Sequence, residues 1–65
     1  MKVNNGDVFT RNGNFFIVKK TSDGHYYTAL LLGHAKITAW HRISKKKLTT
    51  DFVKVEDYEG KGIEL

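Results

Sequence analysis

The 65-residue chain contains no cysteine and no proline. Without cysteine it can form neither a disulfide nor a thiolate zinc site, two usual ways of stabilising so small a domain. It also lacks any apolar run near the roughly 18 residues that a membrane helix requires. The opening Met1-Lys2-Val3-Asn4-Asn5 has no hydrophobic stretch behind it and is not typical of a signal peptide. We therefore expect a cytoplasmic protein with no membrane partner.

Aromatic residues are what the chain offers for building a core. Four phenylalanines, three tyrosines and one tryptophan occur in 65 residues, and each can bury roughly 150–250 Å². A chain of this length supports one domain with a marginal core, so a homo-oligomer is a further expected source of stability. We place the domain at residues 1–55 and an acidic, fraying tail at residues 56–65.

Charge is divided unevenly along the chain, although the total is only +4. Residues 1–50 hold nine Lys and Arg against two Asp, a net +7, whereas residues 51–65 hold two Lys against five Asp and Glu, a net −3. A basic body favours a polyanionic partner, either nucleic acid or an acidic protein surface. Two other interpretations stay open: the charge serves solubility alone, or the acidic tail folds back and screens the basic body.

Regular turn signals divide the chain into short strands. Glycines punctuate the first half at intervals of about ten residues, at Gly6, Gly13, Gly24 and Gly33. The pair Asn12-Gly13 suits a two-residue hairpin turn, in which both residues need a positive φ. The pattern predicts a helical turn at 45–48 capped by Ser44, and strands over 7–10, 15–21, 25–32, 36–43 and 52–55.

A helix over residues 28–40 is the competing interpretation for the middle of the chain. Its leucines and alanines support a helix locally. Gly33 in its centre and the β-branched pair Ile37-Thr38 oppose it.

Five short antiparallel strands with one helical turn before the last are the layout of an all-β, SH3-like barrel. In that barrel the last strand pairs with the first, which removes exposed edges. The chain resembles the small SH3-like domains common in bacteriophage genomes in four segments: Gly6-Asp7-Val8-Phe9, residues 12–18, residues 43–48 and Phe52-Val53-Lys54-Val55. The resemblance covers residues 6–55, implies a phage or mobile-element origin and leaves the activity open.

Basic and aromatic residues are interleaved along the predicted strands. Cationic side chains neutralise phosphates or pair with carboxylates, and exposed rings stack on bases or anchor a protein contact. The candidate partner-binding residues are therefore Lys19, Lys20, Tyr26, Tyr27, Trp40, Arg42, Lys45, Lys46 and Lys47. For the three consecutive lysines, a solvated turn without a partner is the alternative interpretation.

Strand alternation predicts which of these side chains are accessible. Each pair of adjacent rings should have one ring pointing inward and one outward, in Phe15-Phe16 and in Tyr26-Tyr27. In the strand over 36–43 we take the face of Ile37 as the core, which places Trp40 and Arg42 side by side outside. The alternative is that Trp40 lies in the core and His41 is exposed.

No pattern typical of catalysis or metal binding is found in the sequence. No known ligand spacing fits the histidines His25, His34 and His41. No base or nucleophile pairs recognisably with the acids Asp7, Asp23, Asp51 and Glu56. We therefore predict a protein that is not an enzyme, with no catalytic residue, no metal site and no cofactor.

Two functions remain. The first is a protein-binding module, such as a phage-type modulator or inhibitor that binds a host protein in the host cytoplasm. The second is a nucleic-acid-binding SH3-like module that uses the basic and aromatic face. The five acids after residue 50 favour the protein partner, because a protein surface of mixed charge can use both ends of this chain.

Overall fold

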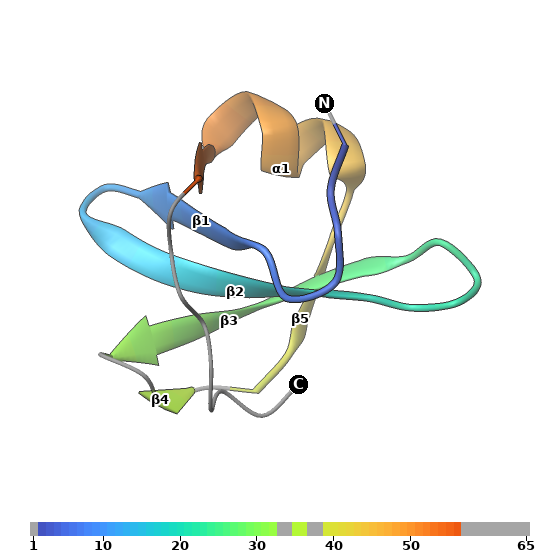
Figure 1. Ribbon diagram of the computed structural model, residues 1–65, viewed down its shortest axis with the longest axis horizontal. Helices are drawn as coiled ribbons and strands as arrows, with labels where there is room; N and C mark the ends of the chain where they lie inside the picture. Colours follow the sequence, from blue (N-terminus) through green and yellow to red (C-terminus); the bar gives the residue numbers. More distant parts are fainter. Residues whose placement is uncertain (1, 33–34, 37–38, 57–65) are drawn as a thin grey trace.

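The computed structural model describes residues 2–32, 35–36 and 39–56, which form six strands and one short helix (Figure 1). The elements are β1 (Val8–Arg11), β2 (Asn14–Lys20), β3 (Tyr26–Leu32), β4 (Ala35–Lys36), β5 (His41–Ile43), α1 (Lys45–Asp51) and β6 (Val53–Val55). All pairings are antiparallel, in the order β4-β3-β2-β1-β6 with β5 also on β3. The predicted all-β class is confirmed. The acidic tail after Glu56 lies outside the described residues, as do Gly33, His34, Ile37 and Thr38.

Two tight hairpins join the first three strands where the sequence predicts them. Asn12 (φ 51°) and Gly13 (φ 80°) link β1 to β2, both with the positive φ that a two-residue hairpin of the I′ kind requires. Gly24 (φ 88°) lies in the turn from β2 to β3, where its amide donates to the Thr21 carbonyl at 3.0 Å. The turn residues with positive φ, Asn12, Gly13 and Gly24, thus help to set the register of the first three strands.

The strand β2 lies between β1 and β3 and forms the middle of the sheet. Its Ile17 pairs with Val8 on one side and with Ala29 on the other. Val8 also pairs with Val55 of β6, so the predicted pairing of the first and last strands is confirmed. Within the part of the chain that the structure describes, no pairing joins β6 to β4 or β5, and the sheet is open there.

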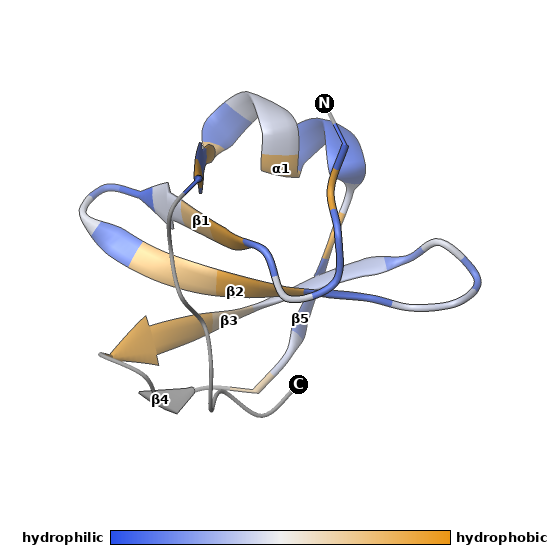
Figure 2. Cartoon of the chain, in the orientation of Figure 1, coloured by the Kyte–Doolittle hydropathy of each residue, from blue (hydrophilic) through white to orange (hydrophobic). Residues whose placement is uncertain are grey.

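One face of the sheet, which we call the helix face, packs beneath α1 (Figures 1 and 2). Phe9, Val18 and Tyr26 from three strands form a buried cluster with Leu48 and Phe52. Leu48 is the buried residue of α1 and has 0 % exposure. A helix that is otherwise hydrophilic (Figure 2) is therefore held to the sheet through one leucine.

The other face of the sheet, which we call the opposite face, is also buried in its middle. A second cluster is formed there by Val8, Ile17, Ala29 and Leu31, with Trp40 and Val55 packed against it. Neighbouring strand residues point to opposite faces, so runs such as Ile17-Val18 supply one apolar side chain to each cluster. Apolar side chains are therefore buried on both faces of the sheet.

The structure corrects the predicted strand over residues 36–43. Residues 35–36 form β4 and residues 41–43 form β5, whereas Ala39 and Trp40 belong to no strand. The predicted core face of this segment depends on Ile37, which lies outside the described residues. The competing helix over 28–40 is wrong, because residues 28–32 continue β3 and residues 28–31 pair with β2.

The predicted helical turn after Ser44 is a full helix of seven residues. The Ser44 hydroxyl accepts a hydrogen bond from the Lys47 amide at 3.1 Å, which confirms Ser44 as the N-cap. The helix runs three residues beyond the predicted turn, to Asp51, whose carboxylate lies 3.0 Å from Nζ of Lys47. No helix among the described residues is both long and apolar enough to cross a membrane.

Candidate binding surface

Strand register arranges the side chains of the opposite face in three rows. Paired residues in antiparallel strands share a face, so the register defines each row. The apolar end row consists of Val53, Thr10, Phe15 and Leu31 on β6, β1, β2 and β3, and the backbone register continues it to position 36 of β4. The buried middle row consists of Val55, Val8, Ile17 and Ala29. The basic end row consists of Lys19, Tyr27 and Arg42.

The basic end row brings together three of the residues that the sequence singles out, and a fourth, Trp40, contacts it through Lys19. Lys19 pairs with Tyr27, and Tyr27 pairs with Arg42 of β5. Nζ of Lys19 lies 5.7 Å from the centre of the Trp40 ring, within the range of a cation–π contact. Two cationic and two aromatic side chains therefore share one end of the opposite face.

The burial of Trp40 is intermediate between the two predictions, one of an exposed side chain and one of a core side chain. Trp40 is half-buried against the middle row, so it is neither fully outside nor part of a closed core. Arg42 and His41 are both exposed. The prediction that Trp40 stands outside beside Arg42 is met only in part, because Arg42 is exposed whereas Trp40 packs against the cluster of the opposite face.

Lys20 and Tyr26 belong to the helix face and lie apart from the basic end row. They pair across β2 and β3, and Nζ of Lys20 lies 5.8 Å from the centre of the Tyr26 ring. Tyr26 is a buried member of the helix-face cluster. Little of the ring is therefore accessible for stacking, although Tyr26 also lines the hollow beside Arg42.

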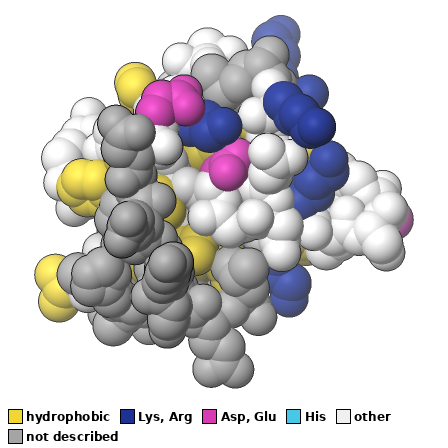
Figure 3. Space-filling view, viewed as in Figure 1, with side chains coloured by type: hydrophobic (Ala, Val, Ile, Leu, Met, Phe, Trp, Pro, Cys, Tyr) yellow, Lys and Arg dark blue, Asp and Glu magenta, His cyan; other side chains and the backbone are white. Residues whose placement is uncertain are grey.

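The three consecutive lysines lie on α1 and are all exposed. They differ in their surroundings: Lys47 forms an ion pair with Asp51, whereas Lys45 lines a hollow beside Arg42. The run is thus neither a uniform basic patch nor a simple turn. In the view of Figure 3, Lys and Arg side chains gather along the upper right of the molecule.

The hollow beside Arg42 is open to solvent and has a volume of about 320 Å³. It lies where the β2–β3 turn, β5 and the start of α1 meet, and its lining is Gly24, His25, Tyr26, Arg42, Ile43, Ser44 and Lys45. Sequence reasoning did not select His25 as a binding residue. The β3–β5 pairing carries it there, because Arg42 lies opposite Tyr27, two residues from His25.

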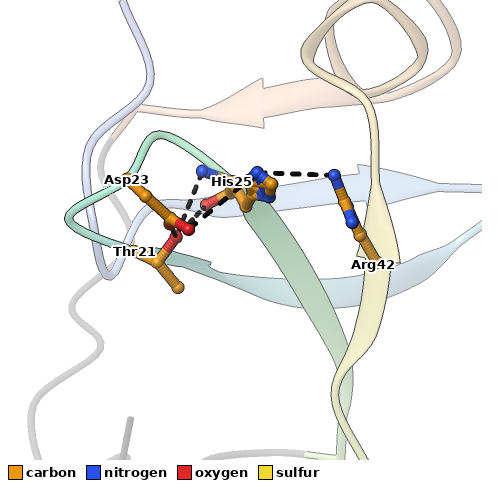
Figure 4. A network of polar contacts seen from close by, with 4 residues as sticks. All are labelled: Thr21, Asp23, His25 and Arg42. Carbon is orange, nitrogen blue, oxygen red and sulfur yellow. Dashed lines mark hydrogen bonds and ion pairs between the residues drawn. The ribbon is translucent and has the colours of Figure 1, made fainter.

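A polar network surrounds the imidazole of His25 (Figure 4). Nη2 of Arg42 lies 3.4 Å from Nε2 of His25, and Oδ2 of Asp23 lies 4.0 Å from the same nitrogen. A guanidinium only donates, so Nε2 accepts from Arg42 in the neutral tautomer that carries its proton on Nδ1. A ring that carries a proton on Nε2, either the other neutral tautomer or the charged form, would instead direct it toward Asp23.

Asp23 has a partner of its own in the turn. The Thr21 hydroxyl donates a hydrogen bond to the Asp23 carboxylate (Figure 4), and this bond lowers the pKa of Asp23 below its ordinary value, with a smaller contribution from nearby His25. Asp23 is thus held as an anion at neutral pH. It lies at the edge of the hollow and is not among its lining residues.

The apolar end row carries exposed hydrophobic side chains that sequence reasoning did not select. Phe15 is 41 % exposed and Val53 is 67 % exposed, and both are in register with Thr10. The signal available in the sequence was the pair Phe15-Phe16. Phe16 is the more buried ring and packs edge-on against Phe52, with ring centres 5.2 Å apart.

Comparisons with protein families, curated proteins and solved structures find no match to this chain. Among the residues that the structure describes, no three His, Cys, Asp or Glu side chains are grouped so that they could hold a metal ion. The candidate surface therefore has to be interpreted from its own geometry.

Proposed function

We propose that this chain is a small non-catalytic binding module, built as an SH3-like barrel, that docks on an acidic surface of another protein. The strand order, with the last strand on the first and one helix before it, supports the barrel. The surface used is the opposite face. The observation that carries the proposal is that this face has exposed apolar side chains at one end and cations with aromatics at the other.

The composition of this face suits a protein partner better than a nucleic acid. Interface centres are enriched in aromatic residues and arginine and depleted in lysine and acids, with a polar rim. Phe15 and Val53 expose apolar area that a polyphosphate backbone does not use, whereas Tyr27, Trp40 and Arg42 are of the residue types that dominate protein contacts. Charge on Lys19 and Arg42 would steer an acidic partner into place.

The area required is compatible with the size of the molecule. A standard interface covers roughly 800 Å² on each partner, and the whole chain exposes 4434 Å². Phe15 and Lys19 are four residues apart on β2, about 13 Å along the strand. One partner can therefore contact both end rows at once.

The resemblance to phage SH3-like domains supports a role as a modulator or inhibitor of a host protein in the host cytoplasm. A small module without catalytic groups acts by occupying a surface that its partner needs. Two of the four described acids are neutralised by lysines, since Asp7 lies 3.5 Å from Nζ of Lys54 and Asp51 is paired with Lys47.

The test is affinity capture from extracts of the source cell with matched variants, followed by reconstitution with the purified candidate. Phe15→Ser removes the apolar end and Lys19→Glu reverses charge at the basic end, while Lys46→Glu on α1 makes the same charge change away from the face. We expect a partner that binds the wild type and Lys46→Glu and is lost with the other two. A candidate retained equally by all four chains, or released by nuclease, contradicts the proposal.

Nucleic acid is the second candidate, favoured by the alignment of Lys19, Tyr27 and Arg42 in one cross-strand row. Such a row could follow a strand, with the cations on phosphates and the ring stacked on a base. Fluorescence anisotropy of labelled single- and double-stranded DNA and RNA at about 50 and 200 mM salt tests this. Micromolar affinity that falls steeply with salt would favour it over the protein partner.

A further inference from the structure

The hollow between the β2–β3 turn, β5 and α1 has a chemistry that the opposite face does not share. Three nitrogen-bearing side chains from three different elements line it: His25, Arg42 and Lys45. Among the described residues no Asp or Glu lines it, although the Asp23 carboxylate lies 4.0 Å from Nε2 of His25. Its volume of about 320 Å³ is at the lower end of the range for small-ligand sites.

Arg42 is the residue that connects the hollow to the rest of the surface. It ends the basic end row beside Tyr27, and its guanidinium faces the imidazole of His25 at 3.4 Å (Figure 4). A guanidinium offers several donors in a planar fork, and only one is directed at Nε2 in this contact. The remaining donors suit the oxygens of an anion placed in the hollow.

We propose that this hollow binds the phosphate monoester of a phosphorylated side chain on the partner protein, an inference that rests on the proposed function. Arg42 and Lys45 together supply two positive charges, which match the nearly dianionic monoester at neutral pH. A carboxylate or a phosphodiester carries one negative charge and leaves one of these cations unmatched. Clustered arginine with a second cation is a recurring means of recognising phosphorylated residues.

His25 reinforces the anion once the anion is bound. With its proton on Nδ1 the neutral imidazole accepts from Arg42 through Nε2, whereas a ring with a proton on Nε2 donates through this nitrogen to a phosphate oxygen. The charged groups that face this ring are Arg42, from β5, and Asp23, from the same turn. A phosphate between His25 and Arg42 separates the two nitrogens from direct contact and bonds to both.

The experiment is a titration of the isotope-labelled full chain with O-phosphotyrosine and O-phosphoserine, followed by amide chemical shifts. Unphosphorylated tyrosine and serine are the ligand controls. We expect saturable shifts centred on residues 24–26 and 42–45 with the phosphorylated probes alone. Absence of shifts at these amides, or equal shifts with the unphosphorylated amino acids, overturns the inference.

Two exposed helix lysines supply a matched pair of variants. Lys45→Ala and Lys46→Ala remove the same charge from adjacent positions, but only Lys45 lines the hollow. We expect Lys45→Ala to raise the dissociation constant about two- to fivefold and Lys46→Ala to leave it unchanged. Arg42→Ala should raise it about tenfold or more. Equal effects of the two lysine variants would show diffuse charge attraction and overturn the site.

The source of the phosphate is tested in the same titration with an oligonucleotide that lacks terminal phosphates. Binding of this phosphodiester at residues 42–45 as tight as that of the phosphoamino acids overturns the monoester site in favour of a nucleic-acid backbone. The phosphate site can fail while the proposed protein-binding function holds, because Phe15 and Lys19, which test that function, do not line the hollow. A partner lost with Phe15→Ser but indifferent to phosphorylation refutes this inference alone.

Discussion

Burial of the opposite face predicts that Ile17→Ala strongly destabilises the fold. Ile17 is 1 % exposed and packs with Val8 and Ala29. The substitution removes three carbons at about 0.8 kcal/mol each, and the cavity left behind brings the cost to about 2–5 kcal/mol. A domain of this size has a total stability of about 3–10 kcal/mol, so Ile17→Ala removes a large part of it.

Urea unfolding followed by circular dichroism measures this cost. With a slope near 1 kcal/mol per molar urea, Ile17→Ala should lower the midpoint by about 2 M or more, and the milder Ile17→Val by about 1 M. Val53→Ala is the matched control, because it changes a β-branched residue on the same face that is 67 % exposed and should cost under about 1 kcal/mol. If Ile17→Ala costs no more than Val53→Ala, the opposite face is not a packing face and the three-row arrangement is wrong.

Two further predictions concern local polar contacts. Ser44→Ala removes the acceptor for the Lys47 amide and should lower the free energy of unfolding by about 1 kcal/mol. Ser44→Asp, which keeps an acceptor, should restore the wild-type value. A urea midpoint of Ser44→Ala equal to that of the wild type would contradict the capping role. The Thr21 hydrogen bond lowers the pKa of Asp23 in the folded protein. The ionised carboxylate therefore stabilises the fold at every pH above the unfolded-state pKa of 3.8. This stabilisation is lost as the pH falls through the folded-state pKa. Wild type should therefore unfold at higher urea than Asp23→Asn at pH 6, and the gap should close as the pH falls below 3.8. A gap that does not depend on pH refutes this.

Features set by short-range backbone chemistry could be predicted from the sequence. The hairpin at Asn12-Gly13 requires two positive φ angles, which these two residues readily adopt. Ser44 begins the helix because its side chain caps a free amide. Alternation also correctly placed Tyr26 and Tyr27 on different faces.

Features that depend on long-range pairing could not be predicted. Both faces of the sheet are apolar. Alternation alone therefore does not say which ring of the pair Tyr26-Tyr27 is accessible, and it did not show that Tyr26 is buried. The contact between His25 and Arg42 spans 17 positions in the chain. It follows from the register of β3 with β5, which depends on the path of the segment between these strands and not on any local pattern.

The most direct test of the proposed function is an amide chemical-shift footprint of the labelled chain with its purified partner. The account predicts shifts or broadening along residues 15–19 and 27–31 and at residues 40–43, the parts of β2, β3 and β5 that carry the opposite face. Residues 49–51, at the end of α1 away from the hollow, should remain unchanged. A footprint confined to α1, or one reproduced by nucleic acid alone, would contradict the assignment of this face to a protein partner.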